Sequence, residues 1–286
     1  IILTLCWARL ATAYHDIYDG GIGQHSTFHY ELTRTLVRAA GFSAQQAEEI
    51  AVINEALDQR SFTGYQDSQG HATHVRITNT RRLSGYGTYW HFPRRDCTNS
   101  HGVSYPFPAS ATTCNTCEYF RGTIDPCPNG VPELNGIDQW ALYGNASAVP
   151  VVSSYSVNGG RLTTVLPQSI EALGIFLHAL ADSYSHQYCM QTTQLRTHDP
   201  SPPECNHNTW HLDMEFGIEN DDLGVPYTIS AGQAVFQNAL LFISLNGGGG
   251  SRLWTDEQAN NFIMAYAREE NAQIRAQMAI DAYNNL

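Results

Sequence analysis

The sequence predicts a mainly α-helical protein, a multi-helix bundle with one long irregular insertion and a small β-hairpin. Three observations predict this class. Apolar residues recur at helical spacing in several segments, Ser or Thr followed three residues later by Gln marks two helix starts, and glycine marks helix ends. Residues 60–132 lack a sustained period and are rich in turn residues, which is typical of irregular structure.

The first two helices are expected between residues 24 and 58. The first begins near Gln24 and ends at Gly41, a natural helix stop. Its apolar residues recur every four positions: Phe28, Leu32, Leu36 and Ala40. Ser43 and Gln46 form a capping box, which predicts a second helix that ends at about Asp58.

A β-hairpin is expected next, over residues 151–166. This stretch is rich in β-branched residues, and Asn158-Gly159-Gly160 is a suitable hairpin turn. Pro150 precedes it, where a residue without an N–H is tolerated. Pro167 then marks the expected start of the next helix, which carries the strongest chemical signal in the chain.

Three further helices are expected towards the C-terminus. A short one surrounds Trp210, and a longer one runs from about Ala231 to Leu245, before a run of four glycines. Thr255 begins the last, which runs through about Tyr283 as one continuous helix.

With 286 residues the chain can bury a full core, so we expect residues 14–286 to form a single domain with its insertion at about 60–165.

The helix after Pro167 contains three potential metal ligands within an apolar run. His178, Asp182 and His186 follow one another at four-residue spacing, which places neighbours on nearly the same helix face. A buried carboxylate without a cation is costly, because an unpaired charge loses its hydration. A single histidine on an apolar helix is more often a hydrogen-bonded core residue. The full pattern of three ligand types instead favours a metal cluster.

A second cluster of ligand types lies at residues 207–215. His207 and His211 are four residues apart, and so are His211 and Glu215. Either pair can bind one zinc ion together with His186. The alternative is a polar surface turn, which the neighbouring Trp210 makes less favourable.

Several other side chains are candidate ligands. His29 lies on the first helix, and Asp58 ends the second, where the helix dipole disfavours a negative charge and calls for a compensating cation. His71 and His74 follow after a short polar loop, and His91 lies among aromatic residues. A solvated loop position is the alternative for Asp58, and a packed core position is the alternative for His91.

Composition and the first residues favour a secreted protein. The net charge of −12 argues against a broad nucleic-acid or anionic-membrane surface, but not against an enzyme that holds one phosphate on metal ions. No run of about 20 apolar residues is present, so no transmembrane segment is expected. Residues 1–13 are apolar and close on Ala11-Thr12-Ala13, the pattern of a signal remnant, with an ordered tail as the alternative. Asn145 begins a glycosylation sequon.

The cysteines predict disulfides within the insertion. Four of the seven lie between residues 97 and 127, in a loop-like stretch. An exported chain meets an oxidising compartment, so we expect two disulfides among Cys97, Cys114, Cys117 and Cys127. Cys189 and Cys205 flank a proline-rich stretch and are expected to pair, which would tether the segment after His186 to the segment before His207.

The order of the candidate ligands resembles that of the zinc-dependent phospholipase C and P1-type nuclease superfamily. The order runs through His29, Asp58, a histidine 13 or 16 residues later, His178-x-x-x-Asp182, His186, and His207/His211-x-x-x-Glu215. The segments Phe28–Thr33 and Ala40–Ser43, with the His-x-x-x-Asp-Ser helix, resemble an uncharacterised divergent branch of the same superfamily more closely. The resemblance spans roughly residues 25–217, in ligand order rather than continuous similarity.

This resemblance implies a mostly helical fold, a cluster of two or three zinc ions and hydrolysis of phosphodiester bonds. Asp182 would bridge two ions, and Asp58 would also act in catalysis by orienting the attacking hydroxide. The implied ligand sets are Asp58, His178, Asp182 and His71 (or His74) at one site, His29 and Asp182 at another, and His186 with His211 and Glu215, or with His207 and His211, at the third.

The sequence thus predicts a secreted zinc-dependent hydrolase of phosphodiester bonds in phospholipid or nucleic acid. An alternative from another class is an extracellular structural or self-assembling protein, a homo-oligomer or filament on a degenerate metal-hydrolase scaffold. The apolar N-terminal segment and the cysteine-rich insertion motivate that alternative.

Overall fold

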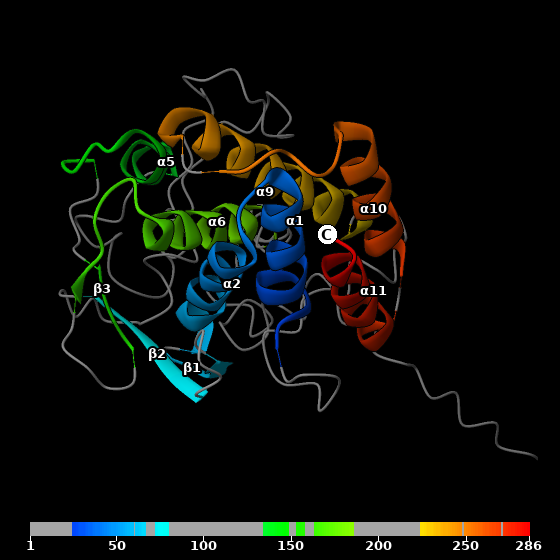
Figure 1. Cartoon of the computed structure of the whole chain (residues 1–286), viewed down its shortest axis with the longest axis horizontal. Coiled ribbons are helices and arrows are strands. Elements are labelled where there is room, and N and C mark those ends of the chain that lie inside the picture. Colours follow the sequence, from blue (N-terminus) through cyan, green and yellow to red (C-terminus); the bar gives the residue numbers. More distant parts are fainter. Residues whose placement is uncertain are drawn as a thin grey trace, which may run out of the picture.

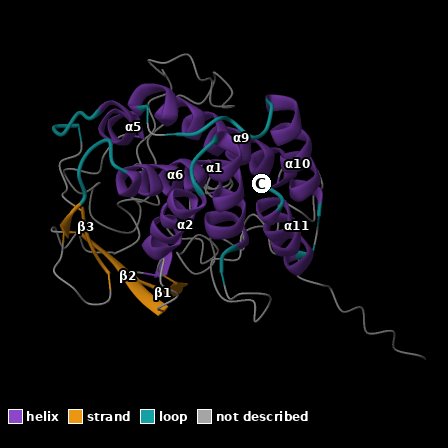
Figure 2. Ribbon diagram, viewed as in Figure 1, coloured by secondary structure: helices purple, strands orange, loops and turns teal. Residues whose placement is uncertain are grey.

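The computed structural model describes residues 25–59, 61–66, 72–79, 134–148, 153–157, 163–185, 224–247, 249–269 and 271–286. In these residues the protein is mainly helical, as the sequence predicted. The helices pack together as one group, and a small antiparallel sheet lies at one end of them (Figure 1). Figure 2 shows the same division, with the strands confined to one side of the helical group.

The first helical segment begins as a π-helix rather than an α-helix. The π-helical stretch η1 spans Thr27–Leu32 and continues directly into α1, Thr33–Ala40. The Ser26 side chain caps it by accepting a hydrogen bond from the backbone N–H of His29. Glu31 N–H donates to the carbonyl of Ser26, five residues earlier, which is the π-helical pattern. The sequence predicted a helix here but not its π-helical first turn.

Gly41 ends α1, as predicted. Its φ of 120° is a conformation that side chains disfavour, and a Cβ there would lie 2.9 Å from the carbonyl oxygen of Gly250. The next helix, α2, spans Ala44–Gln59. Its predicted capping box is confirmed, because Ser43 and Gln46 exchange hydrogen bonds between side chain and backbone N–H.

Helices α6 (Ile170–Ser185) and α9 (Gly224–Asn246) form the centre of the helical group. Helix α6 packs against α2, α9 and α5, and α9 also packs against α1 and α10. Helix α6 carries apolar side chains on all of its faces, which is typical of a core helix. Its fully buried members are Ala172, Leu173, Ile175, Phe176, Leu177, Ala179 and Leu180. Each buried Leu or Phe contributes about 1.5–3 kcal/mol to folding.

The sheet has four antiparallel strands in the order β1-β2-β3-β4. The predicted hairpin is present as β3 (Ser153–Val157) paired with β4 (Thr163–Thr164). Strands β1 (Ser61–Gln66) and β2 (Ala72–Asn79) correct the prediction that this part of the insertion is irregular. A bulge at Gly64 interrupts the register between Thr63 and Tyr65, so the period-2 signal of β1 is broken.

Helix α5 (Leu134–Tyr143) also lies within the predicted insertion, which is therefore not irregular throughout. It packs against α6 and α9. Ile137, Ala141 and Leu142 are buried there, at spacings of four and five residues. The segment is only ten residues long and contains Gly136, so its sequence signal is weak.

Two helix starts differ from the prediction. Helix α6 starts at Ile170, where the Ser169 side chain accepts from the N–H of Ala172, rather than at Pro167. Helix α9 starts at Gly224, seven residues before the predicted Ala231, and includes a proline in its first turn, where no N–H partner is needed.

The predicted last helix is two helices, α10 (Asp256–Arg268) and α11 (Ala272–Asn284). The predicted Thr255 capping box is present. The break occurs because Glu269 has an extended backbone and Asn271 caps a new helix, accepting from the N–H groups of Gln273 and Ile274.

Among the described helices, α9 alone is long and apolar enough to cross a membrane, judged by length and composition only. Its Thr228–Asn246 window has a mean hydropathy of 1.2 and is half buried inside the protein. The core helix of a soluble protein meets the same criterion, and α9 contacts α1, α6 and α10. The expectation that the chain has no transmembrane segment stays a prediction.

Several sequence predictions fall outside the described residues. They include the apolar segment 1–13, the short helix near Trp210, most of the insertion and all seven cysteines. The disulfides, the single-domain organisation and the signal remnant therefore stay predictions.

Gly174 sets the closest approach of α6 to α2, and we expect its replacement to destabilise the protein. A Cβ at this position would lie 2.9 Å from Cβ of Ile53 and 3.0 Å from the carbonyl oxygen of Ile50. Gly174→Ala should lower the free energy of unfolding by about 1–3 kcal/mol, despite the better helix propensity of alanine. Urea unfolding followed by circular dichroism measures this change.

Gly232→Ala is the matched control. The three atoms nearest to a Cβ at Gly232 would be side-chain atoms of Ile263, the nearest at 2.9 Å, and a side chain gives way more easily than backbone. We expect this variant to lose less free energy of unfolding than Gly174→Ala. Equal losses in the two variants would contradict a special role for the contact at Gly174.

Candidate metal centre

Three of the predicted ligands meet in the interior of the helical group. Nε2 of His29 lies 3.2 Å from Oδ1 of Asp182, and Nε2 of His178 lies 3.3 Å from Oδ2 of the same carboxylate. One ligand atom from each residue can be chosen so that all three lie within 4.8 Å of one another. This group can hold a metal ion. His29 comes from η1 and the other two from α6, so segments about 150 residues apart in sequence build the site.

The site is fully buried. The side chains of His29, His178 and Asp182 are 1%, 0% and 0% exposed. Residues next to them in the sequence, such as Phe28 and Leu177, are apolar and equally buried. A carboxylate in such surroundings needs compensating charge or several donors, because it has lost its hydration. A bound cation would supply that charge.

Asn54, on α2, touches both histidines and was not among the predicted site residues. Its Oδ1 lies 2.9 Å from Nδ1 of His29 and 3.2 Å from Nδ1 of His178. The two imidazole rings lie side by side, with centroids 4.3 Å apart and planes 31° apart. The sequence signal for it is weak, since Asn54 and Glu55 are both polar residues within the otherwise apolar stretch from Ile50 to Leu57.

The donor set fits a zinc-like cation. When Asn54 Oδ1 accepts a hydrogen bond from Nδ1–H of each ring, both Nε2 atoms of the neutral histidines carry lone pairs. These lone pairs then face the carboxylate oxygens of Asp182. Two hydrogen-bond acceptors repel each other at this distance unless a cation lies between them. Two ligands of one tetrahedral zinc ion, each bound at about 2.0–2.1 Å, are about 3.3–3.4 Å apart. The two nitrogen–oxygen distances here are 3.2 and 3.3 Å.

The other predicted ligands are not brought to this group by the described part of the structure. Asp58 and His74 are placed only through their backbones, on the last turn of α2 and on β2. Asp58 follows Asn54 by one helical turn, the spacing of residues on one helix face. The remaining predicted ligands, with the candidate His91, lie outside the described residues: His71, His186, His207, His211 and Glu215.

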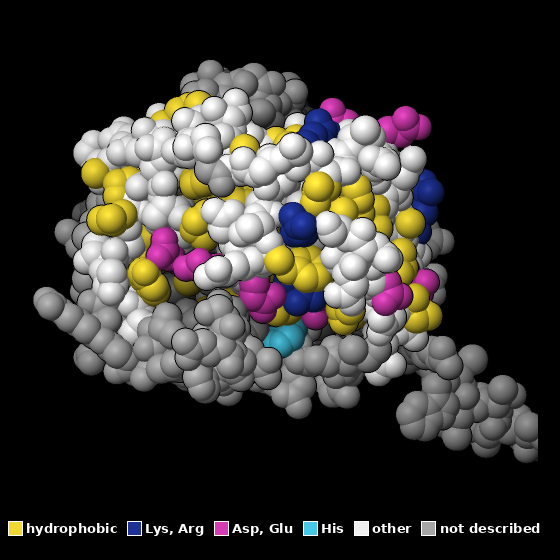
Figure 3. Space-filling model, viewed as in Figure 1, with side chains coloured by type: hydrophobic (Ala, Val, Ile, Leu, Met, Phe, Trp, Pro, Cys, Tyr) yellow, Lys and Arg dark blue, Asp and Glu magenta, His cyan; other side chains and the backbone are white. Residues whose placement is uncertain are grey.

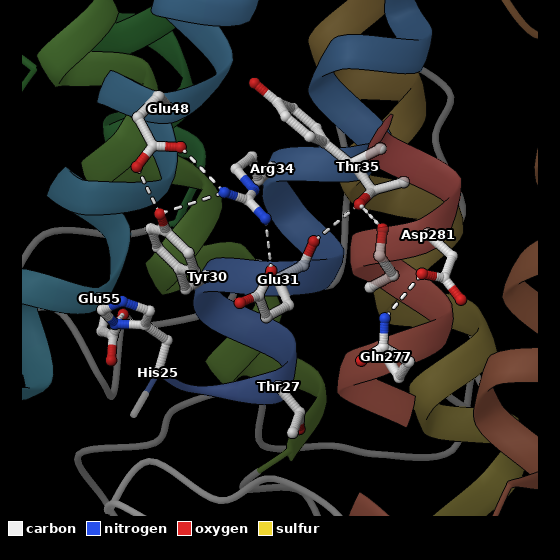
Figure 4. A network of polar contacts seen from close by, with 12 residues as sticks. His25, Thr27, Tyr30, Glu31, Arg34, Thr35, Glu48, Glu55, Gln277 and Asp281 are labelled. Carbon is white, nitrogen blue, oxygen red and sulfur yellow. Dashed lines mark hydrogen bonds and ion pairs between the residues drawn. The ribbon is translucent and has the colours of Figure 1, made fainter. Parts of the chain in front are cut away.

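A polar network joins the start of the first helical segment, η1 and α1, to α2 (Figure 4). Glu55, the residue after Asn54, accepts a hydrogen bond from the backbone N–H of Ser26 at 3.0 Å, and its Oε2 lies 3.3 Å from Nδ1 of His25. These contacts fix the start of η1 against α2. They therefore also fix the position of His29, three residues after its cap.

The network continues through Arg34, the first arginine of α1. Its guanidinium donates to Oε2 of Glu31 at 2.8 Å and to Oε2 of Glu48 at 3.1 Å. It also lies over the rings of Tyr30 and Tyr283, at 4.9 and 4.3 Å from their centroids. In Figure 3 acidic and arginine side chains gather beside a histidine on this face of the molecule.

Burial changes the ionisation of this network. Burial raises the pKa of the Glu31 carboxyl to about 7, although the Arg34 guanidinium acts in the opposite direction. Burial and the Glu48 carboxylate together raise the pKa of the Tyr30 hydroxyl, which donates a hydrogen bond to Glu48. Tyr30 therefore stays neutral and acts as a donor at any physiological pH.

Known proteins give no further guidance. The chain matches no protein-family model, no curated protein and no solved structure. The functional conclusion consequently depends on the geometry of the site and on the order of ligands in the sequence.

Removing the carboxylate charge should remove metal. We expect Asp182→Asn to lose at least one bound ion, because the carboxylate contacts both histidines and the amide would be a much weaker ligand. Metal content of protein purified without added metal, measured by mass spectrometry, tests this. Asp281→Asn on the exposed face of α11 is the matched control and should keep its metal. An unchanged metal content in the Asp182 variant would contradict the site.

Protonation of Glu31 should make the stability of the protein depend on pH. Its pKa is about 7 in the folded protein, against 4.5 for an exposed glutamate. The folded state thus binds more protons between these values, so the free energy of unfolding should fall as pH rises from 4.5 to 7, by about 1–3 kcal/mol. Urea unfolding of wild type and Glu31→Gln at pH 5 and pH 8 measures the difference.

The Glu31→Gln variant should show a smaller fall over this range, since it cannot release the proton. Glu257→Gln, an exposed position in the first turn of α10, should retain the wild-type dependence. The interpretation fails if wild type and Glu31→Gln lose the same stability between the two pH values.

Proposed function

We propose that this protein is a secreted zinc-dependent hydrolase of phosphodiester bonds, of the phospholipase C or nuclease type. One observation carries the proposal: His29, His178 and Asp182 meet in the buried centre of the protein. They stand in the sequence in the order that the phospholipase C and P1-type nuclease superfamily uses for its zinc ligands. The mainly helical architecture is consistent with that superfamily.

Asp182 is the proposed bridging ligand between two zinc ions. Each of its oxygens faces a different histidine, Oδ1 towards His29 and Oδ2 towards His178. This arrangement supports two neighbouring ion positions that share one carboxylate. Because imidazole nitrogen and carboxylate oxygen both suit zinc, the donor set also agrees with the metal that the resemblance implies.

The rest of the proposed centre comes from residues on the same helices or just beyond them. Asp58, near the end of α2, with His71 or His74 would complete the site of His178. His186 follows Ser185, the last residue of α6, and would begin the third site. Its partners would be His211 with either Glu215 or His207.

Bound zinc would supply Lewis acidity: it lowers the pKa of water and offsets the negative charge of the phosphoryl group. The residues of the chain supply the setting. Asp182 and the two histidines would hold the cations in a dry interior, where charges interact strongly. Asp58 would accept a hydrogen bond from the attacking water and hold it in line with the phosphorus. The acidic surface, with a net charge of −12, favours a substrate that is held at the metals rather than by a basic patch.

Hydrolysis of three substrates tests the proposal. We expect purified protein to cleave bis(p-nitrophenyl) phosphate, and to prefer either phosphatidylcholine vesicles or single-stranded DNA. Chelation should abolish the rate and added Zn²⁺ should restore it. Asp182→Asn should lower the rate at least about 100-fold, since changes even outside the ligand shell cost 10–100-fold in such sites.

Asp281→Asn should retain the wild-type rate. A wild-type protein that binds zinc but cleaves none of the three substrates would contradict the proposed reaction. A protein that neither binds zinc nor cleaves, and that forms large assemblies in light scattering, would favour the structural alternative instead.

A further inference from the structure

One neutral side chain contacts both histidines of the metal centre on the side away from Asp182. Asn54 is fully buried, and its Oδ1 lies within hydrogen-bonding distance of Nδ1 of both His29 and His178. The opposite ring nitrogens, both Nε2, face Asp182 at 3.2 and 3.3 Å. The two imidazoles are therefore held between one amide and one carboxylate.

With both rings neutral, two arrangements of protons are compatible with these four contacts. In the first, both rings carry the proton on Nδ1, donate to the Asn54 carbonyl and leave both Nε2 lone pairs towards Asp182. In the second, the Asn54 amide is turned over, its NH₂ group donates to both Nδ1 atoms, and both Nε2–H groups donate to Asp182. Only the first arrangement leaves nitrogen lone pairs for a cation.

We propose that Asn54 is a positioning residue that holds His29 and His178 together in the metal-binding tautomer, with its carbonyl oxygen as the shared acceptor. Ligating histidines commonly donate their other N–H group to such an acceptor, which fixes the tautomer and the ring orientation. Here a single oxygen serves two rings, because it has two lone pairs and the rings lie side by side at 4.3 Å. This inference rests on the proposed metal centre.

An amide suits this position better than a carboxylate. Asp182 already places one negative charge in the interior, and an aspartate in place of Asn54 would add a second with no exposure to water. That second charge would attract the Nδ1–H protons strongly and would also compete with Asp182 for the cation. The neutral carbonyl selects the tautomer without changing the charge of the site.

The fold brings Asn54 to this position through two close contacts of α2. The residue before it, Ile53, packs on Gly174 of α6, where a Cβ would lie at 2.9 Å. The residue after it, Glu55, accepts a hydrogen bond from the backbone N–H of Ser26 at the start of η1. Three consecutive residues of α2 thus contact the two segments that carry the histidines.

The amide nitrogen of Asn54 is buried and has no hydrogen-bond partner among the residues that the structure describes. The geometry of the side chain is therefore set by its oxygen. A leucine at this position, similar in volume, would remove the shared Oδ1 acceptor from both Nδ1–H groups in the first arrangement. The rings would then gain more by moving their protons to Nε2 and donating to Asp182.

Nuclear magnetic resonance of the zinc-loaded protein with ¹⁵N-labelled histidine shows which ring nitrogen carries the proton. In wild type we expect both His29 and His178 to carry it on Nδ1, as hydrogen-bonded signals that exchange slowly with water, and we expect this protection to be lost in Asn54→Leu. The ring signals are assigned by through-bond correlation to the backbone of each histidine. A zinc-loaded wild-type protein in which either ring carries its proton on Nε2 would overturn the proposal, because Asn54 would then present its NH₂ group to that ring.

Zinc affinity, measured by competition with a chromophoric chelator, is the second readout. Asn54→Leu should weaken zinc binding about 10–100-fold, whereas Asn54→Asp keeps the acceptor and should lose less than Asn54→Leu. Asn238→Leu is the matched control, since Asn238 is also a buried asparagine but donates to the Ala234 carbonyl of its own helix. It should match wild type in zinc affinity. Thermal unfolding of each variant shows that the comparison is made on folded protein.

The outcomes separate this inference from the proposed function. Zinc binding with the expected tautomers, but no hydrolysis of any substrate, would refute the reaction and leave the role of Asn54 intact. Hydrolysis and zinc binding that are the same in wild type and Asn54→Leu would refute the role of Asn54 and leave the reaction intact.

Discussion

The buried carboxylate of Asp182 is the constraint on which the rest of the structure depends. It lies in the last turn of α6, an apolar helix of the core, without exposure to water. An ionised group there needs charged or hydrogen-bonding partners, because it has lost its hydration. His29 and His178 are placed against its two oxygens, and Asn54 is placed behind both of them. The arrangement of η1, α2 and α6 follows from the need to bring these three side chains to one point.

That need is met by close packing rather than by long side chains. Gly174 removes a side chain where α6 would otherwise collide with α2. Glu55 and Ser26 tie the start of η1 to α2, and Tyr266 on α10 donates to the carbonyl of Thr27 at 2.7 Å. Each contact lies within a few residues of a ligand. The rigidity of the centre is therefore built into the helix contacts around it, and a change in one contact reaches the ligands through the backbone.

The class of the fold and the core of the site could be predicted from the sequence, because both depend on local patterns. Helical spacing and the Ser43 and Thr255 caps predicted most helices, and the four-residue spacing of His178 and Asp182 predicted that these two side chains lie together. The short strands could not be predicted, since a bulge at Gly64 interrupts the alternation of β1. The break between α10 and α11 depends on a single cap, Asn271.

Asn54 was harder to predict than the ligands, for a physical reason. A buried asparagine carries no charge and has no motif, and its importance depends on which groups from other helices surround it. The pairing of Asn54 with two histidines, one of them 124 residues away, is a tertiary property. The spacing of residues along one helix reveals direct ligands more readily than it reveals the groups that orient them.

The direction in which the His29 side chain points depends on the π-helical turn at Thr27–Leu32. A π-helix accommodates one more residue per turn than an α-helix, so the chain before it is rotated relative to α1. Each residue of an α-helix turns the chain by about 100°. Deleting one residue here would restore an α-helix and swing the imidazole of His29 away from Asp182, while α1 and its apolar face remained in place. The orientation of His29, a candidate ligand, thus depends on one extra residue in the chain. A single-codon deletion would remove that residue without changing any candidate ligand.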